Sequence, residues 1–190
     1  MSHKRESGSL RGSTAEPRME NRMVDLEGET VVFLKVRPGN VDRAVKDLRR
    51  NESVRMAQPT LGPYDVVVRG NFRDDAALRA FVKEVEGKEY ADGCEARPSF
   101  RQWSREKAID APLVGWTLIQ ARNPESAMKG LQNIAAVSRV YEMPGQFNLI
   151  ASVQAKDPPA LMDTLTKEVH KLEGVRRTET LMGFREPEER

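Results

Sequence analysis

An internal repeat is the feature of this sequence that most restricts its fold. Residues 33–83 align without a gap on residues 116–166, at an offset of 83 positions. The identical pairs are Asn40/Asn123, Ala44/Ala127, Lys46/Lys129, Leu48/Leu131, Val54/Val137, Gly62/Gly145, Asp74/Asp157, Ala77/Ala160 and Leu78/Leu161. Several of them fall where structure limits the residue type, at helix starts, at a turn glycine and on apolar helix faces. We therefore predict that each copy is one folding unit.

The residue pattern within each copy predicts the order β-α-β-β-α-β. In the first copy we expect strands at 29–36, 54–60, 64–71 and 94–100, and helices at 41–50 and from Asp74 to about Gly87. In the second we expect strands at 113–121, 137–143, 147–154 and 175–184, and helices after Asn123 and after Asp157. Asn40 and Asn123 are expected to cap the first helix of each copy.

This order predicts an α+β fold made of two tandem ferredoxin-like βαββαβ units. Each unit would form a four-stranded antiparallel sheet with both helices on one face. The other face of each sheet carries Leu, Val and Phe residues, so it needs a cover. We expect the two bare faces to pack against each other, which gives a pseudo-dimer within one chain.

The chain divides into five parts on this interpretation. They are a disordered tail at 1–28, a first repeat at 29–100, a linker at 101–112, a second repeat at 113–185 and a charged end at 186–190. The tail is rich in Ser, Gly, Arg and Glu and lacks apolar periodicity, so it cannot offset its ordering entropy.

Composition favours a cytoplasmic protein without a membrane or nucleic-acid partner. Lys and Arg number 31 against 29 Asp and Glu, a balance too even for a polyanion as the main partner. No apolar run approaches the roughly 20 residues that cross a bilayer. Cys94 is the only cysteine, which fits a reducing compartment. With two histidines in the chain, we expect no metal, no cofactor and no catalytic residue.

Two stretches of the second copy resemble a known family. Residues 137–149 read VSRVYEMPGQFNL and residues 172–180 read LEGVRRTET, which is similar to the effector-binding (RAM) domain of Lrp/AsnC-type transcriptional regulators. The first copy has the hairpin part of this pattern as Gly62-Pro-Tyr-Asp-Val66, but not the closing part.

The resemblance implies a small-molecule effector, an amino acid in many members, and assembly into a homo-oligomer. Family members bind effectors near the hairpin of the second and third strands, which here means Gly62, Tyr64, Asp65, Gly145, Phe147 and Asn148. Asp65 would accept from an α-ammonium group. The alternative is local: turn glycines need a positive φ, and Asp or Asn beside them often bonds nearby backbone.

The DNA-binding helix-turn-helix of this family has no counterpart in residues 1–28, so we expect no direct DNA binding. A second regulator is then a possible partner of this protein. Two other classes stay open. One is a ferredoxin-like assembly or RNA-binding module, and the other is a small dimeric α+β barrel enzyme. A regulatory binding protein without enzymatic activity is the interpretation that we favour.

Overall fold

The computed structural model describes residues 28–184, which form one curved antiparallel sheet of nine strands with four α-helices. The strands are β1 (Thr30–Val36), β2 (Val54–Leu61), β3 (Val66–Gly70), β4 (Ala91–Pro98), β5 (Arg101–Ser104), β6 (Leu113–Ala121), β7 (Val137–Glu142), β8 (Leu149–Ala155) and β9 (Val175–Phe184). The helices are α1 (Val41–Leu48), α2 (Asp75–Glu86), α3 (Pro124–Asn133) and α4 (Pro158–Lys167), followed by the 3-10 turn η1 (Val169–Lys171). The expected tail, apart from Gly28, and the expected charged end lie outside the described residues.

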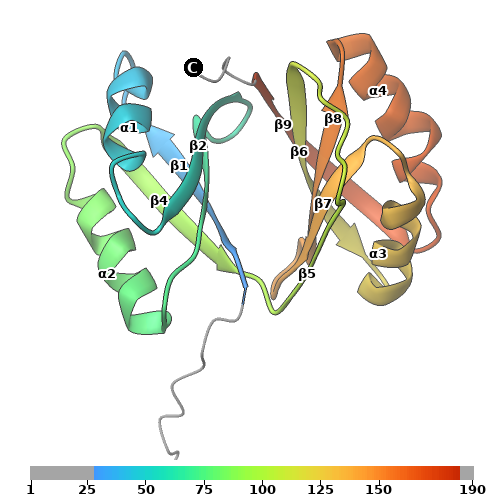
Figure 1. Cartoon of the computed structure of the whole chain (residues 1–190), viewed down its shortest axis with the longest axis horizontal. Coiled ribbons are helices and arrows are strands. Elements are labelled where there is room, and N and C mark those ends of the chain that lie inside the picture. The colour runs from blue at the N-terminus through green and yellow to red at the C-terminus, as the bar shows by residue number, and fades with distance from the viewer. Residues whose placement is uncertain (1–27, 185–190) are drawn as a thin grey trace, which may run out of the picture.

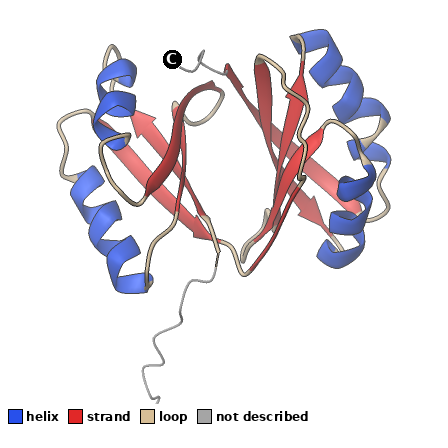
Figure 2. Cartoon of the chain, viewed as in Figure 1, coloured by secondary structure: helices blue, strands red, loops and turns tan. Residues whose placement is uncertain are grey.

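The predicted element order is present on both sides of the sheet. We call β1–β4 with α1 and α2 the first half, and β6–β9 with α3 and α4 the second half. The strand order is β4-β1-β3-β2-β9-β6-β8-β7-β5. The two halves face each other, and the helices cover the outer face of each (Figures 1 and 2).

Helix caps explain where three of the four helices begin. Asp74 accepts a hydrogen bond from the N–H of Ala77 at 2.8 Å, and Asp157 accepts one from Ala160 at 2.8 Å. Asn123 caps α3 in the same way, and Pro124 follows it in the first turn. Asn40 occupies the predicted N-cap position of α1, but it makes no capping hydrogen bond. Its amide donates instead to the carbonyl oxygens of the turn before it, so its side chain makes no cap.

Apolar side chains form three clusters, two of them between the sheet and its helices. The third lies between the two halves and confirms that the bare sheet faces pack together. It contains Val31, Phe33, Val67, Val114, Trp116, Leu118, Tyr141, Met143, Phe147, Ile150 and Leu181. Phe33, Ile150 and Leu181 are fully buried there, and burial of such side chains is worth about 1.5–3 kcal/mol each.

The expected pair of separate four-stranded sheets is corrected to one continuous sheet. The edge strands of the two halves meet, because β2 pairs with β9 at Thr60↔Gly183 and Leu61↔Met182. The expected linker 101–112 also begins as a strand, since β5 pairs with β7 from Arg101↔Glu142 to Ser104↔Arg139. Both additions satisfy backbone groups that a separate sheet would leave unpaired at its edges.

Two other boundaries differ from the sequence prediction. β4 begins at Ala91 and not at residue 94, because the chain before Cys94 already pairs with β1, with Gly93 opposite Lys35. The last helix ends at Lys167, and the buried Val169 belongs to the separate 3-10 turn η1. None of the described helices is long and apolar enough to cross a membrane.

Candidate functional site

Asp65 and Asn148 hold the ends of two equivalent strands. Oδ2 of Asp65 accepts a hydrogen bond from the N–H of Val36, the last residue of β1, at 2.7 Å. Oδ1 of Asn148 accepts from the N–H of Ala121, the last residue of β6, and its Nδ2 donates to the Ala121 carbonyl, both at 2.9 Å. The local role thus accounts for both side chains, and an ammonium-binding role for Asp65 stays a prediction.

Gly62 and Gly145 occupy the two hairpin turns with φ values of +141° and +120°. This conformation is open to glycine and strained for other residues, so turn geometry explains both positions. A Cβ at Gly62 would lie 3.5 Å from Leu181, whereas a Cβ at Gly145 would meet nothing within 4 Å. The β7–β8 turn therefore stands open, and its backbone is accessible to a ligand.

Three of the six predicted residues line one cavity, which we call the hairpin cavity. Its volume is about 420 Å³, and its wall consists of Tyr64, Glu95, Ala96, Arg97, Pro98, Leu118, Pro144, Gly145, Gln146, Phe147 and Glu179. Tyr64 comes from the first half, while Gly145 and Phe147 come from the hairpin of the second. Gly62, Asp65 and Asn148 lie outside this wall. The structure therefore brings predicted residues of the two copies together at one place.

Charged side chains of both signs surround the hairpin cavity. Arg97 holds Glu95 through its Nε at 2.8 Å and its Nη2 at 2.6 Å. Glu179, which also lines the cavity, accepts from Arg177 at 2.6 Å. The guanidinium of Arg177 in turn lies 5.5 Å from the ring centre of Phe147. The four charged residues lie on β4 and β9, where sequence patterns offer no reason to look for ligand contacts.

Tyr64 connects the aromatic and charged parts of this cavity. Its ring centre lies 5.0 Å from that of Phe33, and its hydroxyl donates to Glu95. Burial and this hydrogen bond raise the pKa of Tyr64 above its usual value of 10.0, so the phenol stays a neutral donor near pH 7. The Tyr64 hydroxyl is therefore a neutral hydrogen-bonding group in the wall of the cavity.

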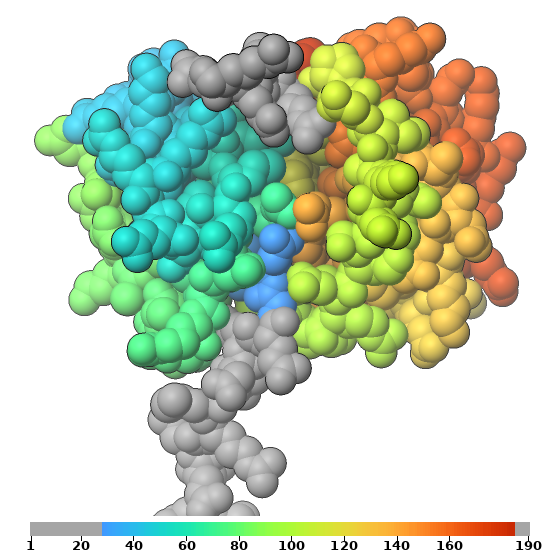
Figure 3. Space-filling model, in the orientation of Figure 1, coloured from blue at the N-terminus to red at the C-terminus, as the bar shows by residue number. Residues whose placement is uncertain are grey.

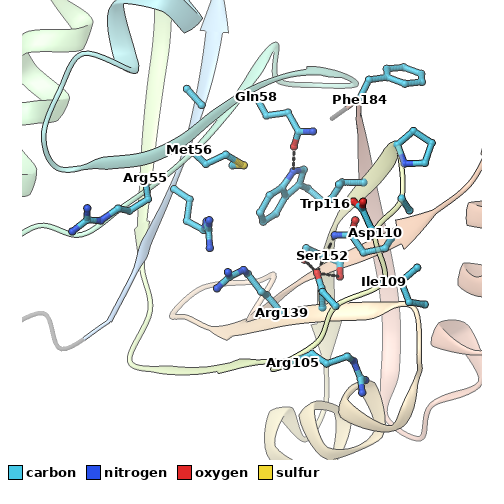
Figure 4. A pocket seen from close by; sticks show the side chains of 18 of the residues that line it. Arg55, Met56, Gln58, Arg105, Ile109, Asp110, Trp116, Arg139, Ser152 and Phe184 are labelled. Atoms are coloured by element: carbon cyan, nitrogen blue, oxygen red, sulfur yellow. Dashed lines mark hydrogen bonds between the residues drawn. The ribbon is translucent and has the colours of Figure 1, made fainter. Parts of the chain in front are cut away.

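A larger cavity lies between the two halves, which we call the inter-sheet cavity (Figure 4). Its volume is about 1060 Å³. The wall is formed by Arg49, Arg55, Met56, Ala57, Gln58, Arg69, Arg105, Ala108, Ile109, Asp110, Ala111, Pro112, Val114, Trp116, Ser138, Arg139, Ser152, Gln154 and Phe184. The surface is hollowed between the first half and the segment after β5 (Figure 3). Sequence reasoning missed this site, because it forms only when the halves meet.

Cys94 and His170, the cysteine and the histidine within residues 28–184, both have structural surroundings. Burial raises the pKa of the Cys94 thiol to about 12, which keeps it protonated and unreactive at neutral pH. His170 lies at the surface, with its Nε2 2.8 Å from Oγ1 of Thr178. Across residues 28–184, no group of His, Cys, Asp and Glu side chains is arranged to hold a metal ion.

Several solved structures are similar to this chain. A siroheme decarboxylase, NirDL, superimposes with a TM-score of 0.66 at 9% identity, over 83% of this chain and 71% of that one. A protein from Thermus thermophilus is 34% identical over 40% of this chain and 96% of its own, with a TM-score of 0.37. AsnC from E. coli is 20% identical over 44% of this chain and 63% of its own, also with a TM-score of 0.37. No curated protein matches the chain.

The likeness to the decarboxylase, at 9% identity, concerns the fold alone. The family comparison is more specific. Residues 117–190 match the model of the Lrp/AsnC ligand binding domain. This segment includes the β7–β8 hairpin with Gly145 and Phe147, and it includes β9 with Glu179. Residues 117–190 of this chain, which hold most of the second half, are thus similar to the Lrp/AsnC ligand binding domain.

Proposed function

We propose that this protein is a regulatory module that binds an amino acid in the hairpin cavity. The observation that carries the proposal is the convergence of Tyr64 from the first half with Gly145 and Phe147 from the second on one cavity. The family match supports an effector-binding role for the second half. The volume of about 420 Å³ is enough for a free amino acid.

The charges around the hairpin cavity fit a zwitterion. Arg97 can donate to an α-carboxylate, and the backbone of the open turn at Gly145 can add an N–H donor. Glu95 and Glu179 can accept from the α-ammonium group. Phe147 and Leu118 supply an apolar surface for a side chain. We infer from this arrangement that binding, without a chemical reaction, is the task of the site.

A ligand held in this cavity would touch both halves of the protein. Tyr64, Glu95 and Arg97 belong to the first half, and Gly145, Phe147 and Glu179 to the second. Binding would therefore stabilise their present arrangement over any more open one. A second regulator, or another copy of this chain, that recognises the closed arrangement would then respond to the amino acid.

The test is a thermal-shift screen of the full chain against the twenty amino acids, followed by calorimetry of each hit. A ligand at one hundred times its Kd adds about 2.7 kcal/mol to the free energy of unfolding. Arg97→Gln should weaken binding about 10- to 100-fold, because a charged hydrogen bond is worth about 1.5–3 kcal/mol. The matched control is Arg176→Gln, at an exposed position on β9 outside the cavity wall. The proposal is wrong if no amino acid shifts the transition, or if both variants bind equally well.

A further inference from the structure

We propose that the inter-sheet cavity is a second binding site, for an organic anion that carries two or more carboxylate or phosphate groups. This site is separate from the hairpin cavity, and the two walls have no residue in common. Its volume of about 1060 Å³ exceeds the 420 Å³ of the hairpin cavity and suits a larger ligand.

The wall of the inter-sheet cavity is strongly cationic. It contains five arginines and, within the described chain, a single acidic residue, Asp110. Two of the arginines have structural tasks. Arg49 donates to the Ala57 carbonyl, and Arg105 donates to carbonyls at the end of α3 and to that of Val137. The remaining three, Arg55, Arg69 and Arg139, are the ones that can meet a ligand.

Among residues 28–184, the ion pairs of Arg69 and Arg139 neutralise only part of their positive charge. Arg69 lies on β3 and Arg139 on β7, so they come from different halves, and both contact one oxygen of Glu29, at 3.2 Å and 3.6 Å. Tyr141 also donates to that oxygen, at 2.7 Å. One carboxylate thus serves two guanidinium groups. Arg55 stands at the exposed rim and has no partner within residues 28–184.

A buried donor in the wall lacks an acceptor. Nε of Arg69 is buried and has no hydrogen-bond partner among the described residues. Leaving such a donor unmet costs about 1–3 kcal/mol, and more for a charged group, so native proteins seldom do it without a bound ion, water or ligand. An anionic group between Arg69 and Arg139 would balance the excess charge, and it would satisfy this donor once the Arg69 side chain turns towards the cavity.

The rest of the wall fits an organic molecule. Ser138, Ser152 and Gln154 form a neutral hydrogen-bonded group, with Gln154 Nε2 3.0 Å from Oγ of Ser138. The indole of Trp116, which lies on β6 beside Ser152, and the thioether of Met56, on the facing half, supply apolar surface (Figure 4). Neutral hydroxyl and amide groups can donate to anionic oxygens, and the apolar part can contact a carbon skeleton.

The experiment uses the full chain with Trp103→Phe, which leaves Trp116 in the cavity wall as the single tryptophan of the sequence. Citrate and pyrophosphate are titrated at constant ionic strength while Trp116 fluorescence is followed, and calorimetry gives each Kd. We expect saturable binding of at least one probe. Citrate binding assigns carboxylate ligands to the site, and pyrophosphate binding assigns phosphate ligands.

Three variants decide whether the binding belongs to this cavity. Arg139→Gln should weaken the bound probe at least tenfold, and Arg55→Gln, at the exposed rim, should weaken it without a risk to folding. Arg122→Gln is the matched control, since Arg122 is exposed and lies outside the wall. The inference is overturned if neither probe binds at millimolar concentration. It is also overturned if Arg122→Gln weakens binding as much as Arg139→Gln, or if Arg139→Gln and Arg55→Gln both bind like the parent.

Discussion

The indole nitrogen of Trp116 donates a hydrogen bond of 2.8 Å to Oε1 of Gln58 (Figure 4). Trp116 lies on β6 and Gln58 on β2, so the bond joins the two halves of the sheet. Both residues are buried, with exposed fractions of 3% and 6%. A hydrogen bond between two buried side chains of different halves helps to fix how the halves are placed.

Trp116→Phe should therefore lower the free energy of unfolding by about 1–3 kcal/mol, because it leaves the Gln58 oxygen without a donor. Urea unfolding followed by circular dichroism measures the loss. Trp103→Phe is the matched control. Trp103 is only half-buried, and its ring contacts the guanidinium of Arg105 at 5.0 Å, an interaction worth about 0.5–1 kcal/mol. An equal or larger loss at Trp103 would contradict the role given to the Trp116 bond.

Gly145→Ala should destabilise the protein by about 1–3 kcal/mol, which is the usual cost of holding a non-glycine residue in a sparsely populated backbone conformation. The added methyl group meets no atom within 4 Å, so the cost arises from the φ of +120° alone. Gly87→Ala is the control, because Gly87 ends α2 with a φ of −76° that alanine adopts without strain. Thermal unfolding of both variants compares them, and equal midpoints would be inconsistent with this explanation.

Asn148→Ala should cost more stability than Asp65→Ala. Asn148 makes two hydrogen bonds with the backbone of Ala121, whereas Asp65 accepts one from the backbone of Val36. Each backbone group left without its partner costs about 1–3 kcal/mol. Urea titrations measure both changes. A larger loss at Asp65 would mean that its carboxylate has a further partner in the folded protein.

The Asp74 cap should make stability depend on pH in the acidic range. The N–H of Ala77 and the side chain of Arg73 hold the pKa of Asp74 below its usual value of 3.8. A carboxyl with a lowered folded pKa contributes its stability above the unfolded pKa and loses it as pH falls through the folded pKa. The advantage of the parent over Asp74→Asn, which keeps a capping oxygen but does not titrate, should shrink below about pH 4. Urea midpoints at pH 7 and pH 3 test this, and an unchanged difference would refute it.

Self-association is expected from the family match and from the exposed apolar residue at the junction of both sheet edges. β4 and β5 are the two terminal strands, and Phe100, which lies between them in sequence, is 66% exposed. Sedimentation of the parent should show species larger than 21.4 kDa at micromolar concentration. Phe100→Ser should shift the distribution towards the monomer, while Met162→Ser, exposed on α4 to 58%, should not. A 21.4 kDa species alone would refute the expectation.

Local sequence patterns predicted the parts of the fold that local physics decides. The boundaries of β6 and β9 match the expectation, because the apolar run of β6 ends shortly before the cap residue Asn123 and β9 begins directly after the turn glycine Gly174. The cap at Asp74 follows from side-chain chemistry within four residues. Asn40 lies at the expected N-cap position but makes no capping bond, because its amide donates to carbonyl groups of the preceding turn. Pairing between distant edges, as in β2 with β9, leaves no such local signature.

The site was predictable only in part, for a related reason. The hairpin pattern pointed to Tyr64, Gly145 and Phe147, which do line one cavity. It could not separate these from Asp65 and Asn148, which serve the backbone, because both roles favour the same residue types beside a turn. The arginines of the inter-sheet cavity lie far apart in sequence, so only the packing of the halves brings them together.

The position of β5 makes the covalent link between the halves less important than the contacts around it. β5 follows β4 in the chain but is hydrogen-bonded to β7, and β9 in turn is hydrogen-bonded to β2. Cleavage of one peptide bond between Ser104 and Leu113 would leave two fragments joined by two interlocking strand pairs and a shared apolar cluster. The two halves are thus arranged like the subunits of a heterodimer, although they belong to one polypeptide. Its two pieces should reassemble when they are produced separately, as a split protein does.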